Sequence, residues 1–61
     1  MEFDKALKDC VEAIRLDPND VNSYVTRGLV LLHMHEFNKA VKDFSEAIRL
    51  EPSLFDATEV N

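Results

Sequence analysis

Apolar residues recur at steps of three and four along two stretches of this chain. From Glu2 to Leu16, this spacing places most apolar side chains on one helical stripe and leaves the charged residues outside it. The same spacing returns at 37–50. Pro18 and Pro52 follow the two stretches, and the residue before a proline disfavours the helical backbone. The pattern therefore predicts two amphipathic helices that each end just before a proline.

The segment between these two helices has a different pattern. Residues 21–34 are apolar nearly all round after Gly28, which predicts a helix covered by neighbours on more than one side. Asp20 precedes this helix and can cap it by accepting a hydrogen bond from a free backbone N–H. A turn at His35 and Glu36 leads into the helix at 37–50. Because short turns make neighbouring helices antiparallel, the chain predicts an all-α fold of three helices, with a truncated fourth beginning near Leu54.

The chain also contains an internal repeat. Residues 2–20 return at residues 36–54 after a shift of 34 positions, and twelve of the nineteen aligned pairs are identical. Unrelated segments would share about one such pair. A fixed period of this length is the signature of a stacked array, in which each unit buries its apolar face against its neighbours. The chain is therefore predicted to be part of a solenoid, and solenoids present extended surfaces that mostly bind other proteins.

The 34-residue period, the two helices in each unit and the terminal proline resemble the tetratricopeptide repeat. On this resemblance, residues 21–54 form one complete repeat, residues 1–20 the second helix and terminal turn of a preceding repeat, and residues 55–61 the start of a following one. The implied architecture is a right-handed α-solenoid of antiparallel helical hairpins. Arg27 stands where the pattern has Leu, and Cys10 stands at the Phe position of the preceding unit. The residues that carry the signature are Tyr24 (at the family's Trp), Gly28, Leu31 (at its Tyr), Ala40, Phe44, Ala47 and Pro52.

Gly28 has a physical interpretation of its own. In the middle of a helix it costs about 1 kcal/mol relative to Ala, so a packing interaction should offset that cost. We expect the helix at 37–50 to approach closely at Ala40 and Ala47. Phe44 would then fill the volume that the small residues leave.

The resemblance implies a binding groove. In this family the first helices of successive repeats line a concave groove that holds an extended peptide or a partner's helix. The corresponding residues here are Asn22, Val25, Thr26, Leu29 and His33, with Asn22 and His33 as the expected polar contacts. The alternative is that Val25 and Leu29 merely pack against neighbouring helices or another subunit. Some members of the family bind the C-terminal carboxylate of heat-shock chaperones through Lys and Asn side chains. Here Val25, Thr26 and Leu29 stand at those positions. This repeat therefore does not support binding of a chaperone tail, although other repeats could supply the required side chains.

The composition of the chain limits the classes of partner that we expect. The net charge of −5 argues against nucleic acid and against an anionic membrane surface, because both need clustered Lys and Arg. No apolar run approaches the ~18 residues of a membrane span, and residues 1–20 lack the layout of a signal peptide. One cysteine cannot form an intrachain disulfide and fits a reducing compartment. We therefore expect a cytoplasmic protein whose partner is a protein or peptide.

The sequence contains no strong motif for catalysis or metal binding. His33 and His35 are two residues apart and point away from each other on a helix, so they and Glu36 do not predict a metal site. Cys10 reads as a small apolar core residue. No catalytic triad, phosphate loop or paired catalytic carboxylates are visible, so we expect neither an enzyme nor a cofactor. The charged residues of the helix at 37–50 read as a solvated outer face: Lys39, Lys42, Asp43, Glu46 and Arg49.

Self-association is the alternative function. Stable arrays normally need three or more repeats, so we expect either an excised fragment of a longer array or a protomer that completes itself by association. Each large apolar side chain that becomes buried is worth about 1.5–3 kcal/mol, and a second copy can cover such side chains through an isologous contact. We therefore expect a homodimer. The residues expected to lack a covering helix are Phe3, Leu7 and Cys10 near one end, and Leu54, Phe55 and Val60 near the other.

The turn at His35 offers a second route to association. Most family members have Gly between the two helices of a repeat, and a left-handed backbone costs a residue such as His roughly 1–2 kcal/mol. An alternative is therefore that the helices at 21–34 and 37–50 fuse into one long helix and exchange between protomers.

Overall fold

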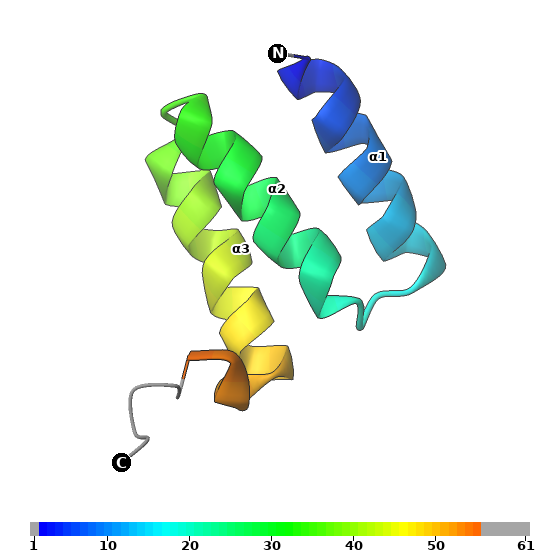
Figure 1. Cartoon of the computed structure of the whole chain (residues 1–61), viewed down its shortest axis with the longest axis vertical. Helices are drawn as coiled ribbons and strands as arrows, with labels where there is room; N and C mark the ends of the chain where they lie inside the picture. Colours follow the sequence, from blue (N-terminus) through cyan, green and yellow to red (C-terminus); the bar gives the residue numbers. More distant parts are fainter. Residues whose placement is uncertain (1, 56–61) are drawn as a thin grey trace.

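The computed structural model describes residues 2–55, which form three α-helices and a short 3-10 turn (Figure 1). Helix α1 spans Phe3–Leu16, α2 spans Val21–His33 and α3 spans Phe37–Leu50, and η1 spans Pro52–Phe55. The predicted all-α fold and its three helices are confirmed. The fourth helical start, expected near Leu54, is a 3-10 turn that begins at Pro52, and residues 56–60 of that prediction lie outside the described part of the chain.

Helix α2 lies between α1 and α3, and the three helices form a single layer (Figure 1). Both outer helices pack on α2, and within residues 2–55 no Cα atom of α1 comes within 8 Å of α3. The turn after each helix reverses the chain, so neighbouring helices run antiparallel. Helix α2 is covered on two sides, as its pattern predicts, yet Leu29 and Leu32 remain 47% and 42% exposed. A single layer therefore leaves two sides of α2 open.

The core is small and lies along both sides of α2. Its apolar members are Cys10 from α1, Val30 and Leu31 from α2, and Ala40 and Ala47 from α3. Cys10 is only 6% exposed, so the expectation that it lacks a covering helix is wrong. Helix α2 itself covers Cys10, because α2 is the helix that packs on α1 within residues 2–55.

Helices α2 and α3 are in tight contact at Gly28. A Cβ atom placed on Gly28 would lie 2.6 Å from Cε1 of Phe44, which is closer than van der Waals contact permits. Gly28 is therefore required by packing, as its mid-helix cost suggests. The group that meets it is the Phe44 ring, whereas the sequence predicts that Ala40 and Ala47 make the approach. Both alanines are buried beside this contact, at 1% and 0% exposure.

The turn between α2 and α3 contains a C-terminal capping motif that ends α2. His35 adopts a φ of 65°, in the left-handed region. The N–H of His35 donates to the carbonyl of Leu32 at 3.0 Å, and the N–H of Glu36 donates to that of Leu31 at 2.8 Å. These two bonds form a Schellman motif, which satisfies carbonyls at the end of α2. The helices are therefore separate, and the fused helix weighed as an alternative is not formed.

The turn between α1 and α2 differs from expectation. Asp20 accepts a hydrogen bond from Oγ of Ser23 at 2.8 Å, and no side-chain cap forms on a backbone N–H. The predicted cap is wrong because the Ser23 hydroxyl takes the carboxylate, while the Ser23 N–H donates to the backbone carbonyl of Asp20 at 3.1 Å. Asp17 orders the same turn by accepting from the N–H of Asn19 at 3.1 Å.

Substitution of Gly28 tests the contact between α2 and α3. We expect Gly28→Leu to destabilise the fold by about 1–3 kcal/mol, because the new side chain meets the Phe44 ring, and this outweighs a gain of about 1 kcal/mol in helix propensity. Thermal melts followed by circular dichroism measure the effect. Ser45→Leu adds the same side chain at an exposed position of α3 and should melt near the wild type. A melting temperature of Gly28→Leu at or above that of the wild type would contradict the packing assignment.

Candidate protein-interaction surfaces

The residues that the resemblance assigns to a groove lie together on one open side of α2. Asn22, Thr26, Leu29 and His33 are exposed, and Val25 is half-buried. They recur at steps of three and four, so they share one helical face. We call this surface the front face. It combines one exposed leucine with polar side chains.

Helix α1 borders the front face. The ring of His33 stacks on Phe3 of α1, with ring centroids 6.3 Å apart and an interplanar angle of 9°. A shallow cavity of about 210 Å³ lies farther along the same border. Its lining joins α1 to α2 and consists of Asp9, Cys10, Ala13, Asn22, Ser23 and Thr26. The front face is therefore bounded by α1, which orders His33 at one end and supplies a depression at the other.

The opposite side of α2 carries an ion pair that sequence reasoning missed. The Arg27 guanidinium donates to both carboxylate oxygens of Asp43 in α3, through Nε and Nη2, each at 2.8 Å. The Asp43 side chain is 8% exposed and that of Arg27 is 26% exposed. The interpretation of Asp43 as part of a solvated outer face is wrong, because Asp43 turns toward α2. The available signal was Arg27 itself, which replaces an apolar residue of the repeat signature and so needs an anion nearby.

The pair is reinforced by its surroundings. The guanidinium carbon of Arg27 lies 5.8 Å from the centroid of the Tyr24 ring, within the range of a cation–π contact. The hydrogen bonds to Asp43 raise the pKa of Arg27 above its ordinary value. Two planar groups meeting through two parallel hydrogen bonds make a specific, charge-assisted contact. Arg27 and Asp43 therefore link α2 to α3 in addition to the contact at Gly28.

Beside this pair lies the larger cavity, which we call the rear cavity. Its volume is about 310 Å³, and it lies on the side of α2 opposite the front face. Leu7 and Val11 of α1 and Leu31 of α2 supply apolar surface, while α3 supplies lysines at the rim. The complete lining is Leu7, Val11, Arg27, Leu31, Lys39, Lys42 and Asp43. All three helices contribute to it, so it exists only in the assembled fold.

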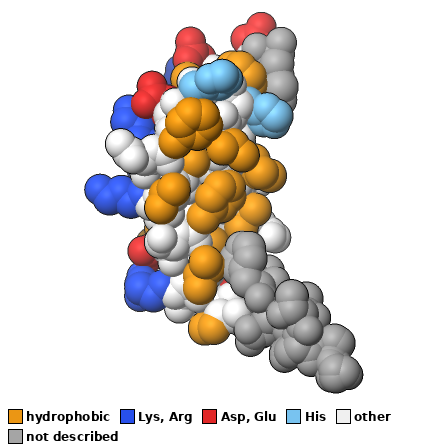
Figure 2. Space-filling view, turned by 90° about the vertical axis from the view of Figure 1, so that its left-hand side faces the viewer, with side chains coloured by type: hydrophobic (Ala, Val, Ile, Leu, Met, Phe, Trp, Pro, Cys, Tyr) orange, Lys and Arg blue, Asp and Glu red, His pale blue; other side chains and the backbone are white. Residues whose placement is uncertain are grey.

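The third surface is the outer face of α3, where large apolar side chains are uncovered. Phe37, Val41 and Ile48 are 54%, 61% and 42% exposed. Figure 2 shows hydrophobic side chains in a stripe along this side of the molecule, with charged side chains at its margin. The repeat relates these positions to Phe3, Leu7 and Ile14 of α1, which are half-buried. Helix α3 therefore exposes the positions that α1 partly buries.

Other candidate chemistry is modest. Burial raises the pKa of the Cys10 thiol, so the thiol stays protonated and poorly nucleophilic at neutral pH. Within the described part of the chain, no three His, Cys, Asp or Glu side chains are grouped to hold a metal ion. Arg49 donates to Glu46 on the exposed side of α3 and lowers the pKa of that carboxyl. Among residues 2–55, none of the helices has both the length and the apolar character needed to cross a bilayer.

Neighbouring helices that run antiparallel, a 34-residue period that relates α1 to α3 and a glycine at a helix contact together define a helical repeat protein. The family model Tetratricopeptide repeat matches residues 21–54, and the chain belongs to the tetratricopeptide repeat family. Comparison with curated proteins and with solved structures gave no significant match. Members of this family typically mediate protein–protein interaction.

The Arg27–Asp43 pair makes a prediction about stability. We expect Arg27→Leu to destabilise the fold by about 2–4 kcal/mol, because it leaves the buried Asp43 carboxylate without its partner. The double variant Arg27→Leu/Asp43→Leu should recover most of that loss, since no buried charge remains. Urea titrations followed by circular dichroism compare the variants. Arg15→Leu removes an exposed pair with Glu12 and should leave the urea midpoint nearly unchanged. A double variant no more stable than Arg27→Leu would show that the pair is not what stabilises this contact.

Proposed function

We propose that this chain is a protein-interaction module that binds a peptide or a partner's helix along the front face of α2. The observation that carries the proposal is the exposure of Leu29 between polar neighbours. An uncovered leucine in the middle of a helix gives a partner apolar area to bury. Asn22 and Thr26 on one side and His33 on the other offer hydrogen bonds that fix the partner's register. No catalytic role is proposed.

The proposal extends to the chemistry of the partner. The chain carries a net charge of −5, so the preferred ligand is an apolar peptide or helix with basic flanks, and nucleic acid should not bind. An anionic membrane surface is disfavoured for the same reason. The free thiol of Cys10 fits a reducing compartment, so a cytoplasmic location is part of the proposal.

Peptide selection tests the front face. Peptides selected on the immobilised chain from a random phage-displayed library, resynthesised with fluorescein, should bind and should shift the amide signals of Asn22, Thr26, Leu29 and His33. We expect Leu29→Asp to weaken their binding about ten-fold or more, because it places a charge where apolar contact forms. Val41→Asp adds the same charge on the outer face of α3 and serves as the control. Equal loss in both variants, or amide shifts confined to other surfaces, would argue against the front face.

Self-association through the outer face of α3 is the second candidate function. The observation that favours it is the exposure of Phe37, Val41 and Ile48 on one helix face. An apolar stripe of this kind marks an interaction site, and an isologous contact between two copies would bury it twice. Of the two sets of residues from which the contact was first expected, the set on α1 is less exposed, since Cys10 is buried and Phe3 stacks on His33. The side chains of the other set, Leu54, Phe55 and Val60, lie outside the described part of the chain.

Sedimentation equilibrium distinguishes this candidate from the first. The chain has a mass of 7.0 kDa, and we expect the wild type at submillimolar concentration to sediment with twice that mass. Val41→Asp should restore the monomer, because burying an unpaired carboxylate at the interface is costly. Leu29→Asp should remain dimeric. A folded wild-type monomer at that concentration would refute the homodimer.

A further inference from the structure

We propose that the rear cavity is a second peptide-binding site, which takes a segment of a partner protein carrying one large apolar side chain beside a carboxylate. The site lies behind α2, between α1 and α3, and is separate from the front face. Leu29 on the front face and Leu31 in the rear cavity are two residues apart, so they point to nearly opposite sides of the helix. Binding in the rear cavity therefore does not require a ligand on the front face.

The apolar part of the site comes from α1 and α2. Leu7 and Val11 stand one turn apart on α1, and Leu31 closes the cavity from α2. Val11 is 51% exposed, so this apolar wall is not covered by another part of the described chain. The volume of about 310 Å³ is at the lower end of the range of about 300–1,000 Å³ for ligand pockets. It suits a single anchoring side chain of a peptide better than a large cofactor.

The polar part of the site is positive. Arg27 and Asp43 satisfy each other through two hydrogen bonds, so they contribute little net charge to the cavity. The Nζ atom of Lys39 lies 4.0 Å from Oε1 of Glu36. Both side chains are largely exposed, and exposed ion pairs are weak. Among the ion pairs of residues 2–55, none involves Lys42. Two lysines therefore remain at the rim of an apolar cavity on a chain whose net charge is −5.

This combination selects the occupant. The apolar wall requires an apolar side chain, and the lysines on one rim favour a carboxylate beside it, through charge complementarity. An aspartate or glutamate next to Leu, Ile, Phe or Met provides both groups in one peptide. A phosphate backbone fits less well, because the wall facing the lysines offers it only apolar surface. The partner preferred here is acidic, whereas the one proposed for the front face has basic flanks.

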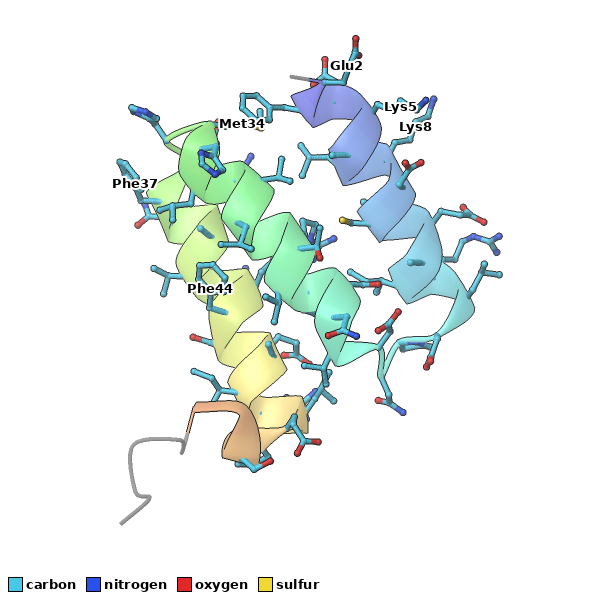
Figure 3. All side chains as sticks on the ribbon, viewed as in Figure 1. Glu2, Lys5, Lys8, Met34, Phe37 and Phe44 are labelled. Atoms are coloured by element: carbon cyan, nitrogen blue, oxygen red, sulfur yellow. The ribbon has the colours of Figure 1, made fainter. Side chains whose placement is uncertain are left out.

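The internal repeat supplies a matched control. Lys5 and Lys8 of α1 occupy the same repeat positions as Lys39 and Lys42 of α3. They are absent from the lining of the rear cavity and extend from the outer edge of α1 (Figure 3). The double variants Lys39→Glu/Lys42→Glu and Lys5→Glu/Lys8→Glu therefore change the net charge equally at equivalent helix positions. Only the first pair changes the charge beside the cavity.

The probe is an array of acetylated hexapeptides in which Leu, Ile, Phe or Met stands beside Asp or Glu, together with the same peptides carrying Gln or Asn in place of the acid. Binding is measured by fluorescence anisotropy up to 1 mM, and the contacts are mapped from amide shifts. We expect the peptides with Asp or Glu to bind and to shift the amide signals of Leu7, Val11, Leu31 and Lys42. Lys39→Glu/Lys42→Glu should weaken binding about ten-fold, while Lys5→Glu/Lys8→Glu should bind nearly as the wild type does.

A further variant and a non-peptide ligand serve as additional tests. If Lys39→Glu/Lys42→Glu loses its helical circular dichroism, Lys42→Gln replaces it and should weaken binding by a smaller factor in a folded protein. The inference is overturned if no array member binds at 1 mM, if the Gln and Asn peptides bind as well as the acids, or if both double variants lose affinity equally. Decanoate provides an apolar tail with a carboxylate but no peptide. If decanoate shifts the same amide signals while none of the peptides binds, the proposal that the occupant is a peptide is overturned.

Discussion

The contact between Gly28 and the Phe44 ring governs the architecture. The ring occupies the space that a Cβ atom would need, so α2 and α3 can pack at this separation only because residue 28 has no side chain. The Schellman motif at His35 turns the chain sharply enough to bring the two helices into that contact. Helix α1 then packs on the other side of α2, so the hairpin of α2 and α3 is the base on which all three surfaces are built.

A single layer of helices explains why the protein presents several surfaces. Within residues 2–55, helix α2 packs only against α1 and α3, so Leu29 is exposed at the front while the buried Leu31 lines the rear cavity. Of the helices α1 and α2, only α2 packs on α3 within residues 2–55, so Val41 is exposed on the other side of α3. These openings follow from the arrangement of helices rather than from unusual residues. Exposed apolar side chains are a direct consequence of this architecture.

The Arg27–Asp43 pair gives the rear side of α2 its particular chemistry. An apolar residue at position 27 would make that side a plain hydrophobic seam, whereas the guanidinium brings a buried carboxylate to the same place. Because the two charges neutralise each other, the lysines at the rim decide the charge of the cavity. The front and the rear of α2 therefore differ in the charged side chains they carry, although one helix contributes to both.

The sequence by itself determined the three helices, the 34-residue period and the family, because helical spacing and repeated residues are local properties of the chain. It also indicated that Gly28 marks a close contact, but not that Phe44 is the side chain that meets it. The front-face residues lie together as their helical spacing requires, whereas their role in binding remains a proposal. Only the tertiary structure decided that Asp43 and Cys10 are buried and that three helices line the rear cavity. Helical periodicity states which residues share a face, but burial depends on where the neighbouring helix lies.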